Sequence, residues 1–200
     1  VIGFNMSEAD ETVTFQGKDD GPVAPATPEV DESEKASTTP VLVRFETNLG
    51  AFVVKVDPEN YPITCRNFLA YVDAGFYEDT LFHRVISGFM VQGGGFDTEM
   101  RRKETRGPIQ NESGLGPIRN TRGTIAMART SAPDSATSQF YINHKDNAFL
   151  DDGPYCAFGR VVEGMSTIDA IAKERTTVRR GMRDVPEEQV IIRSAQRVED

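Results

Sequence analysis

Arg84 and Gln92 lie within one short stretch, Phe82–Gly94, that otherwise consists mainly of apolar residues and glycines. Strand-like alternation places Phe82 on the same face as Arg84 and His83 on the opposite face, although a bulge can break this rule. An apolar surface from which a guanidinium and an amide project is costly unless a ligand uses those groups. The stretch therefore predicts a ligand-binding surface. The alternative interpretation is an exposed arginine beside an apolar pair of the core.

The two histidines of the chain, His83 and His144, could form a hydrolytic centre with Ser138 and Asp146. However, the G-x-S-x-G turn that carries the nucleophile of many hydrolases does not occur in this sequence. His83 also has a structural role available on the strand face opposite Arg84. We therefore do not expect hydrolytic chemistry.

The sequence indicates neither a metal site nor a phosphate site. Cys65 and Cys156 are the only cysteines, and with two histidines they form no cluster with the spacing of zinc ligands. Both fall in apolar patterns, so we expect buried free thiols. Gly93–Gly95 lacks the lysine and the following helix of a phosphate-binding loop, and tight backbone packing explains it better. No cofactor is therefore expected.

The elements that must position these residues are short β-strands interrupted by helices. The first two strand-like runs, Val41–Glu46 and Ala51–Val56, are joined by turn residues and predict a hairpin. Further strand-like segments occur at Leu81–Ile86, Phe89–Gln92, Gly123–Ala128, Gln139–Asn143, Cys156–Val162 and Val190–Ile192. Helical spacing of apolar residues predicts one helix from Pro62 to about Gly75 and a second over residues 165–172. The spacing of the strands suggests a closed β architecture.

Residues 1–40 differ in composition from the rest of the chain. They hold nine acidic residues against two lysines, together with several prolines, so we expect a flexible acidic tail. This tail carries −7 of the net charge of −9, which leaves −2 for the single folded domain expected over residues 41–200. A domain with so little net charge offers no field that would attract nucleic acid.

The basic clusters at residues 101–103 and 179–183 fall in loop-like sequence with acidic neighbours. We interpret them as solvated loops rather than as nucleic-acid contacts. No apolar run is long enough to span a membrane, and no secretory signal opens the chain. We therefore expect a cytoplasmic protein, and nothing in the sequence demands more than a monomer.

Several blocks of this sequence together resemble the cyclophilin family, and its bacterial branch in particular. The first block is the stretch Phe82–Gly94 described above. The others are Gly123–Arg129, Thr137–Asn143, Asn147–Asp151 and Phe158–Val161, which follow in the family's order and approximate spacing. The resemblance covers about residues 41–198.

The resemblance implies a mainly β fold, a closed eight-stranded antiparallel β-barrel capped by two α-helices, with the substrate groove on its outer face. It also implies a peptidyl-prolyl cis/trans isomerase that acts on proline-containing peptides and on unfolded or folding proteins. The catalytic residue would be Arg84. The substrate-binding residues would be Phe89, Met90, Gln92, Ala128, Arg129, Thr130, Gln139, Tyr141, Phe149, Leu150 and Tyr155. The alternative is a chaperone or adaptor module that binds proline-containing segments without catalysis.

Such an enzyme needs little chemical equipment. A prolyl bond resists rotation because amide resonance must be broken, at a barrier of roughly 18–20 kcal/mol. No bond is made or cleaved, so an apolar clamp on the proline ring and groups that favour the twisted amide suffice. The proline nitrogen gains a lone pair as the bond twists, and a guanidinium such as that of Arg84 can stabilise it in a water-poor groove.

Several positions depart from the family's usual residues. Tyr141 stands where phenylalanine is common, and its hydroxyl needs a partner. Phe149 stands where many eukaryotic members have a tryptophan whose indole N–H binds the cyclic peptide cyclosporin, so weak cyclosporin binding is implied. Gly95 replaces a common acidic residue. Arg129 replaces a common asparagine, which matters little if that position binds through its backbone. Tyr155 is aligned with a rim histidine across a loop of different length.

Overall fold

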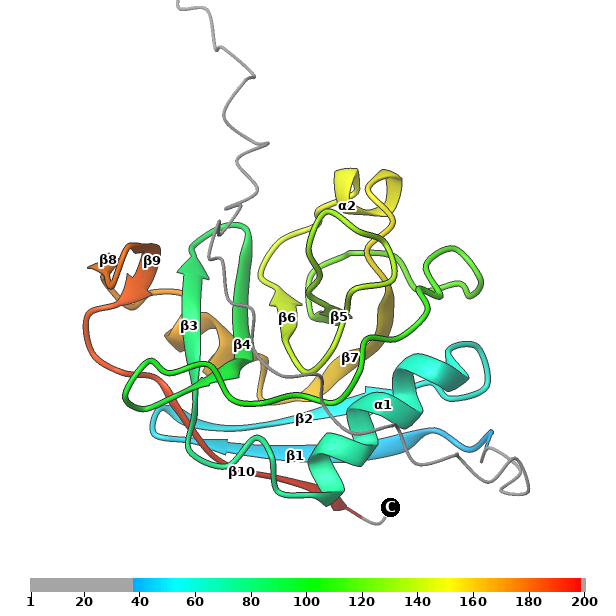
Figure 1. Ribbon diagram of the computed structural model, residues 1–200, viewed down its shortest axis with the longest axis horizontal. Coiled ribbons are helices and arrows are strands. Elements are labelled where there is room, and N and C mark those ends of the chain that lie inside the picture. Colours follow the sequence, from blue (N-terminus) through cyan, green and yellow to red (C-terminus); the bar gives the residue numbers. More distant parts are fainter. Residues whose placement is uncertain (1–37, 199–200) are drawn as a thin grey trace, which may run out of the picture. The chain divides into compact units, whose positions relative to one another are not determined.

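Eight strands form a closed antiparallel barrel in the computed structural model, which describes residues 38–198 (Figure 1). The strands are β1 (Val41–Thr47), β2 (Gly50–Val56), β3 (Thr80–Ile86), β4 (Met90–Asp97), β5 (Thr124–Met127), β6 (Phe140–Asn143), β7 (Ala157–Glu163) and β10 (Ile191–Val198). Around the barrel their order is β1-β10-β3-β4-β6-β5-β7-β2. The predicted eight-stranded barrel is therefore confirmed. The tail predicted for residues 1–40 lies outside the described residues, apart from residues 38–40.

Aromatic side chains fill much of the barrel interior. The fully buried rings that pack there are Phe45, Phe52, Phe68, Tyr77, Phe82, Phe140 and Phe158. Phe45 and Phe52 face each other across the β1–β2 hairpin and stack with 4.9 Å between their ring centroids. Aromatic pairs of this kind stabilise neighbouring strands. Side chains thus fill the interior of this small barrel.

Phe82 departs from the predicted alternation. Its ring lies inside the barrel, 6.0 Å from the ring of Phe140, whereas Arg84 is exposed. The pairing of β3 with β4 shifts register on both sides of Phe82. Such bulges insert an unpaired residue and turn the side chains that follow toward the other face. The prediction that Phe82 and Arg84 share a face is wrong for this reason.

The two predicted helices pack their apolar faces against the barrel core. Helix α1 (Pro62–Asp73) begins at a proline, whose missing N–H suits the first helical turn. It ends before Gly75, which adopts a left-handed φ of 63°. Helix α3 (Met165–Ile171) buries Ile168 and Ile171 in the same core.

One short helix and one two-stranded hairpin were not predicted. Helix α2 (Phe149–Asp152) is a four-residue turn, too short to show a helical pattern in the sequence. Strands β8 (Thr176–Arg179) and β9 (Met182–Pro186) form a separate hairpin that Figure 1 shows beside β3. The basic cluster at residues 179–183 therefore lies in a hairpin and its turn rather than in an irregular loop. Val185 anchors this hairpin by packing against Leu81 and Met100.

Both cysteines are buried free thiols, as predicted. Burial raises the pKa of Cys156 to about 11, so the side chain is a neutral thiol at physiological pH. Within residues 38–198, no helix has the length and apolar character needed to cross a membrane.

Candidate active site

A row of paired residues crosses the outer face of five neighbouring strands. Arg84 in β3 pairs with Gln92 in β4, and Gln92 pairs with Tyr141 in β6. Tyr141 pairs with Ala126 in β5, and Ala126 pairs with Ala157 in β7. Directly paired residues of antiparallel strands project from the same face. Arg84 therefore lies at one end of a continuous surface of side chains that were far apart in the sequence.

The middle of this row belongs to a second apolar cluster, separate from the barrel interior. Its buried members are Met90, Ala126, Tyr141, Leu150 and Ala157, and its half-buried members include Ile86, Phe89, Ile118, Ala128 and Tyr155. Strands β4, β5, β6 and β7 and helix α2 contribute to it. The cluster supplies an apolar surface outside the barrel, which is the feature that a clamp for a proline ring requires.

Two rings extend this surface to the solvent. Phe89, in the turn immediately before β4, stacks on Phe149 of α2 with 5.7 Å between ring centroids. Phe149 is 59% exposed, so one face of its ring is free for a ligand. An exposed aromatic ring that rests on another ring offers a rigid apolar contact.

Gln92 is held beside the cluster by another amide. Its Nε2 atom donates to Oε1 of Gln139 at 3.0 Å. Gly95 leaves room for this arrangement, because a Cβ atom at residue 95 would lie 2.5 Å from Cγ of Gln139. This contact supports the interpretation of the glycine run as tight packing. It also gives a structural reason for glycine at a position where the family often has an acidic residue.

The hydroxyl of Tyr141 has a partner, as its position in an apolar surface requires. It donates to Oδ1 of Asn120 at 2.8 Å, and Nδ2 of Asn143 donates to the same oxygen at 3.1 Å. Nδ2 of Asn120 donates to Asp151 at 2.8 Å. Burial raises the pKa of Tyr141 well above its ordinary value, so the phenol stays neutral. The Tyr141 ring can therefore take part in an apolar surface while its hydroxyl remains bonded beneath it.

Arg129 uses its side chain to join two loops at the rim. Its Nε atom donates to the carbonyl of Pro154 at 3.2 Å, Nη1 donates to the carbonyl of Thr130 at 2.8 Å, and Nη2 donates to the carbonyl of Gly153. The guanidinium also lies 4.3 Å from the ring centroid of Tyr155. An asparagine is too short to make this set of contacts, so the side chain at this position orders the rim in the present chain.

The structure brings most of the predicted site residues together, but not all of them. Phe89, Met90, Ala128, Tyr141, Leu150 and Tyr155 belong to the outer apolar cluster, and Arg84, Gln92, Gln139 and Phe149 border it. Thr130 is not a member of this cluster and lies in an exposed loop, where its hydroxyl donates to Ser135. Sequence reasoning missed Ala126, which the alternation along β5 could have assigned to the outer face. It also missed Asp184, whose neighbour Arg84 is a hundred residues earlier in the chain.

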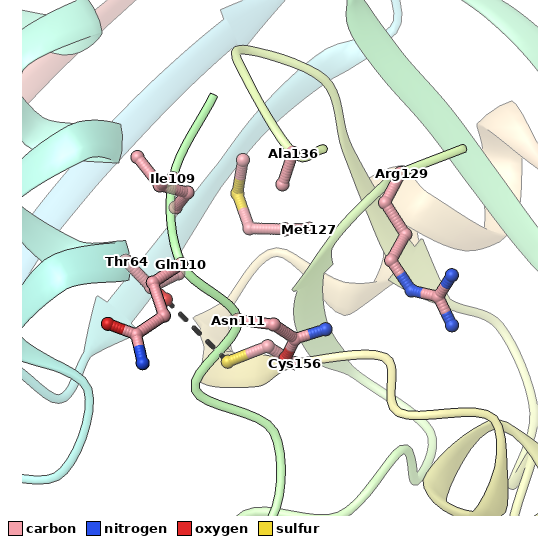
Figure 2. A pocket seen from close by; sticks show the side chains of 8 residues that line it. All are labelled: Thr64, Ile109, Gln110, Asn111, Met127, Arg129, Ala136 and Cys156. Carbon is pink, nitrogen blue, oxygen red and sulfur yellow. Dashed lines mark hydrogen bonds between the residues drawn. The ribbon is translucent and has the colours of Figure 1, made fainter. Parts of the chain in front are cut away.

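A small hollow lies on the other side of Arg129 (Figure 2). It is lined by Thr64, Ile109, Gln110, Asn111, Met127, Arg129, Ala136 and Cys156. Figure 2 shows the Arg129 guanidinium turned away from the centre of this hollow, and the Cys156 thiol facing Thr64 at 3.7 Å. The hollow shares only Arg129 with the predicted site and contains neither Arg84 nor the outer apolar cluster.

Comparison with known proteins gives one consistent result. Residues 42–197 match the model of the family described as cyclophilin-type peptidyl-prolyl cis-trans isomerase/CLD. A relative from Escherichia coli strain K12, peptidyl-prolyl cis-trans isomerase B, is 52% identical over 161 residues, which cover 76% of this chain and 97% of the relative. Peptidyl-prolyl cis-trans isomerase A of Dickeya dadantii strain 3937 is 48% identical over 164 residues, which cover 80% of this chain and 86% of the relative.

A solved structure agrees with the sequence relatives. It is a cyclophilin-type peptidyl-prolyl cis-trans isomerase of Cryptosporidium parvum, determined in the presence of the dipeptide Ala-Pro. It superposes with a TM-score of 0.67 at 26% sequence identity, and covers 80% of this chain and 99% of its own.

Proposed function

The chain belongs to the cyclophilin-type peptidyl-prolyl cis-trans isomerases and is an enzyme of that class, and we propose that it works by clamping proline on the outer apolar cluster while Arg84 stabilises the twisted amide. The observation that carries this mechanism is the row from Arg84 through Gln92 to Tyr141. It sets a guanidinium at the edge of the outer apolar cluster.

The Arg84 side chain has the freedom to reach a substrate. It is 46% exposed, and its one ion pair within residues 38–198 is a long contact to Asp184 at 3.9 Å. Five N–H donors of the guanidinium are thus available for the proline nitrogen and for a neighbouring carbonyl. A bound peptide would exclude water from this edge and so strengthen those hydrogen bonds.

The energetic demand on these groups is moderate. An acceleration of about 10⁵-fold requires roughly 7 kcal/mol of preferential transition-state stabilisation. The apolar cluster holds the ring equally well in both planar forms, so it supplies binding rather than selectivity for the twisted amide. The Arg84 hydrogen bond and the anchoring of the peptide by Gln92 supply the selective part.

The substrates we propose are proline-containing peptides and segments of folding proteins. The likeness to a structure determined with Ala-Pro supports a proline-containing ligand. Phe149 at the rim offers an aromatic face without an N–H donor, so we also propose weak binding of cyclosporin. The cytoplasmic location expected from the sequence stays a prediction.

The test is a prolyl-peptide isomerisation assay on the purified protein. Arg84→Ala should lower kcat/KM by about two orders of magnitude or more, as the loss of one charged donor to a transition state typically does. Arg84→Lys should recover little of it, because a point charge lacks the planar fork. Arg66→Ala, which removes an exposed arginine on α1, is the matched control.

Two outcomes would contradict the proposal. Near-normal turnover by a folded Arg84→Ala variant would exclude the proposed role of Arg84. A wild-type protein that binds prolyl peptides without accelerating their isomerisation would instead support the adaptor alternative.

A further inference from the structure

The turn between β3 and β4 is held from outside by the segment that follows β6. The backbone N–H of Gly88 donates to Nδ1 of His144 at 2.9 Å. The next carbonyl, that of Phe89, accepts from the backbone N–H of His144 and from Nδ2 of Asn147, each at 2.9 Å. This turn carries Phe89 and leads into Met90, so the three hydrogen bonds locate one wall of the proposed proline surface.

The Gly88 hydrogen bond determines where the proton of the imidazole resides. Because Nδ1 accepts from Gly88, the neutral ring carries its proton on Nε2. Nε2 lies 3.1 Å from Oδ1 of Asp169 on α3 and donates to it. Asp169 thus selects the tautomer that leaves Nδ1 free to accept.

Arg122 donates hydrogen bonds to both His144 and Asp169. Its Nη2 atom donates to Oδ1 and Oδ2 of Asp169 at 2.7 and 2.9 Å. Its Nη1 atom donates to the backbone carbonyl of His144 at 2.6 Å. The hydrogen bonds from Arg122 lower the pKa of the Asp169 carboxyl, which keeps it anionic near neutral pH.

The charges that face His144 come from three elements. Helix α3 presents Asp169, and the segment before β5 presents Arg122, whose backbone N–H donates to Asp146 at 2.8 Å. The segment of His144 itself carries Lys145 and Asp146. The β3–β4 turn, residues 87–89, contains no charged side chain. Its Gly88 N–H is the group that forms a hydrogen bond with the imidazole ring.

We propose that His144 is a positioning residue for the substrate surface, and that its neutral form holds the Gly88–Phe89 turn in place while its protonated form releases it. Protonation fills Nδ1, which converts the acceptor into a donor that faces the Gly88 N–H. The contact between Nε2 and Asp169 can persist in the charged ring, because Nε2 remains a donor, so the hydrogen bond that is lost is the one at the turn. This inference depends on the proposed function, because the wall that moves is the proposed wall of the proline groove.

A matched pair of substitutions separates the two sides of the ring. In His144→Asn the side-chain oxygen can occupy the position of Nδ1 and accept from Gly88. In His144→Gln the longer amide can reach Asp169 from the position of Nε2 but offers Gly88 no acceptor. Lys145→Gln, which changes a charge on the same segment, serves as the control.

At pH 8, His144→Gln should lower kcat/KM about threefold to tenfold, because a backbone N–H loses its partner, and His144→Asn should recover most of that loss. Wild-type kcat/KM should fall on acidification with the same midpoint as the NMR titration of the His144 ring. Neither variant should show that fall. The other histidine, His83, is buried and its pKa is lowered to about 4, so its signals are distinguishable.

The amide of Gly88 gives a readout that does not require activity. Its N–H chemical shift should move with the His144 titration, and its hydrogen exchange should be faster in His144→Gln than in His144→Asn. In Asp169→Asn, which keeps an acceptor without the charge, the midpoint of the Gly88 shift should still coincide with that of the His144 ring.

Equal kcat/KM in His144→Gln and wild type, or equal losses in the two histidine variants, would overturn the proposal. A Gly88 amide chemical shift that does not change as the His144 ring is titrated would also overturn it. If wild-type protein shows no isomerisation, the proposed function fails, and the Gly88 shift and exchange still decide whether His144 holds the turn. Asp169→Asn provides the same decision if His144→Gln does not fold.

Discussion

Oδ2 of Asp184, in the β8–β9 hairpin, lies 3.9 Å from Nε of Arg84. Both side chains are partly exposed, at 39% and 46%. Asp184 also has a left-handed φ of 60°, a conformation that aspartate and asparagine tolerate better than most residues. The hairpin thus brings a carboxylate close to the proposed catalytic guanidinium without a direct hydrogen bond.

Replacement of this carboxylate should raise activity slightly. Asp184→Asn removes a charge that offsets the field of Arg84, so kcat/KM should rise about twofold to threefold at low ionic strength, within the range of an exposed ion pair. The gain should shrink in about 0.5 M salt, because exposed charges are screened. The control is Asp73→Asn, which breaks a similarly exposed pair with Arg197 on another part of the barrel. A loss of activity in Asp184→Asn would contradict this role.

The Tyr141 hydroxyl should contribute measurably to stability. Tyr141→Phe removes a buried hydrogen bond but leaves the Asn120 oxygen with its second donor, Asn143. We therefore expect the free energy of unfolding to fall by about 1 kcal/mol, measured by urea denaturation at pH 7. Tyr155→Phe is the matched control, since the Tyr155 hydroxyl makes no hydrogen bond within residues 38–198. Equal changes in the two variants would exclude a specific contribution from the Tyr141–Asn120 bond.

His83 should make the fold less stable in acid. The side chain is 6% exposed, its Nδ1 has no hydrogen-bond partner within residues 38–198, and burial lowers its pKa to about 4. In the unfolded chain a histidine titrates near 6.5, so between pH 6.5 and 4 the unfolded state binds a proton that the folded state does not. The free energy of unfolding therefore falls as pH falls through this window, by about 3 kcal/mol at most.

The substitution His83→Phe isolates this contribution. Phenylalanine can pack on Phe96, whose ring centroid lies 4.6 Å from that of His83, and it does not titrate. Urea denaturation of both proteins at pH 7, 5.5 and 4 should show a smaller loss of stability in the variant. The same pH dependence in both proteins would show that His83 does not bind its proton selectively in the unfolded state.

Cyclosporin should bind more tightly when residue 149 is tryptophan. Phe149 is exposed and stacked on Phe89, so an indole at this position can keep the stacking and add an N–H donor. One added hydrogen bond to a ligand carbonyl should strengthen inhibition up to about tenfold. Titration of the drug into the isomerisation assay of wild type and Phe149→Trp measures the two inhibition constants. An unchanged constant would show that the missing indole is not the reason for weak binding.

Local sequence patterns located helix α1 and each strand of the barrel, although β4 and β10 extend to Asp97 and Val198, beyond their predicted ends. The first-turn proline at residue 62, the apolar residues three and four apart after it, and Gly75 at its end all act within a few residues of one another. The β-branched runs and turn residues of β1 and β2 act over a similarly short range. Such interactions depend on neighbours along the chain, so they are legible without the fold. The expected roles of Arg84 and of most of the groove residues came from the resemblance to the family. A family motif reflects residues that the family's fold brings together.

Only the tertiary structure decided which side chains meet. The bulges around Phe82 arise from the register of β3 against β4, and this register turns Phe82 inward and leaves Arg84 outside. The approach of Asp184 to Arg84 and the contacts of His144 with Gly88 and Asp169 each join distant segments. The sequence contains every one of these residues, but their contacts depend on strand order, bulges and the docking of the hairpin and α3. Those features are set by packing of the whole barrel, in which a shift of one residue in a strand would turn each side chain to the other face.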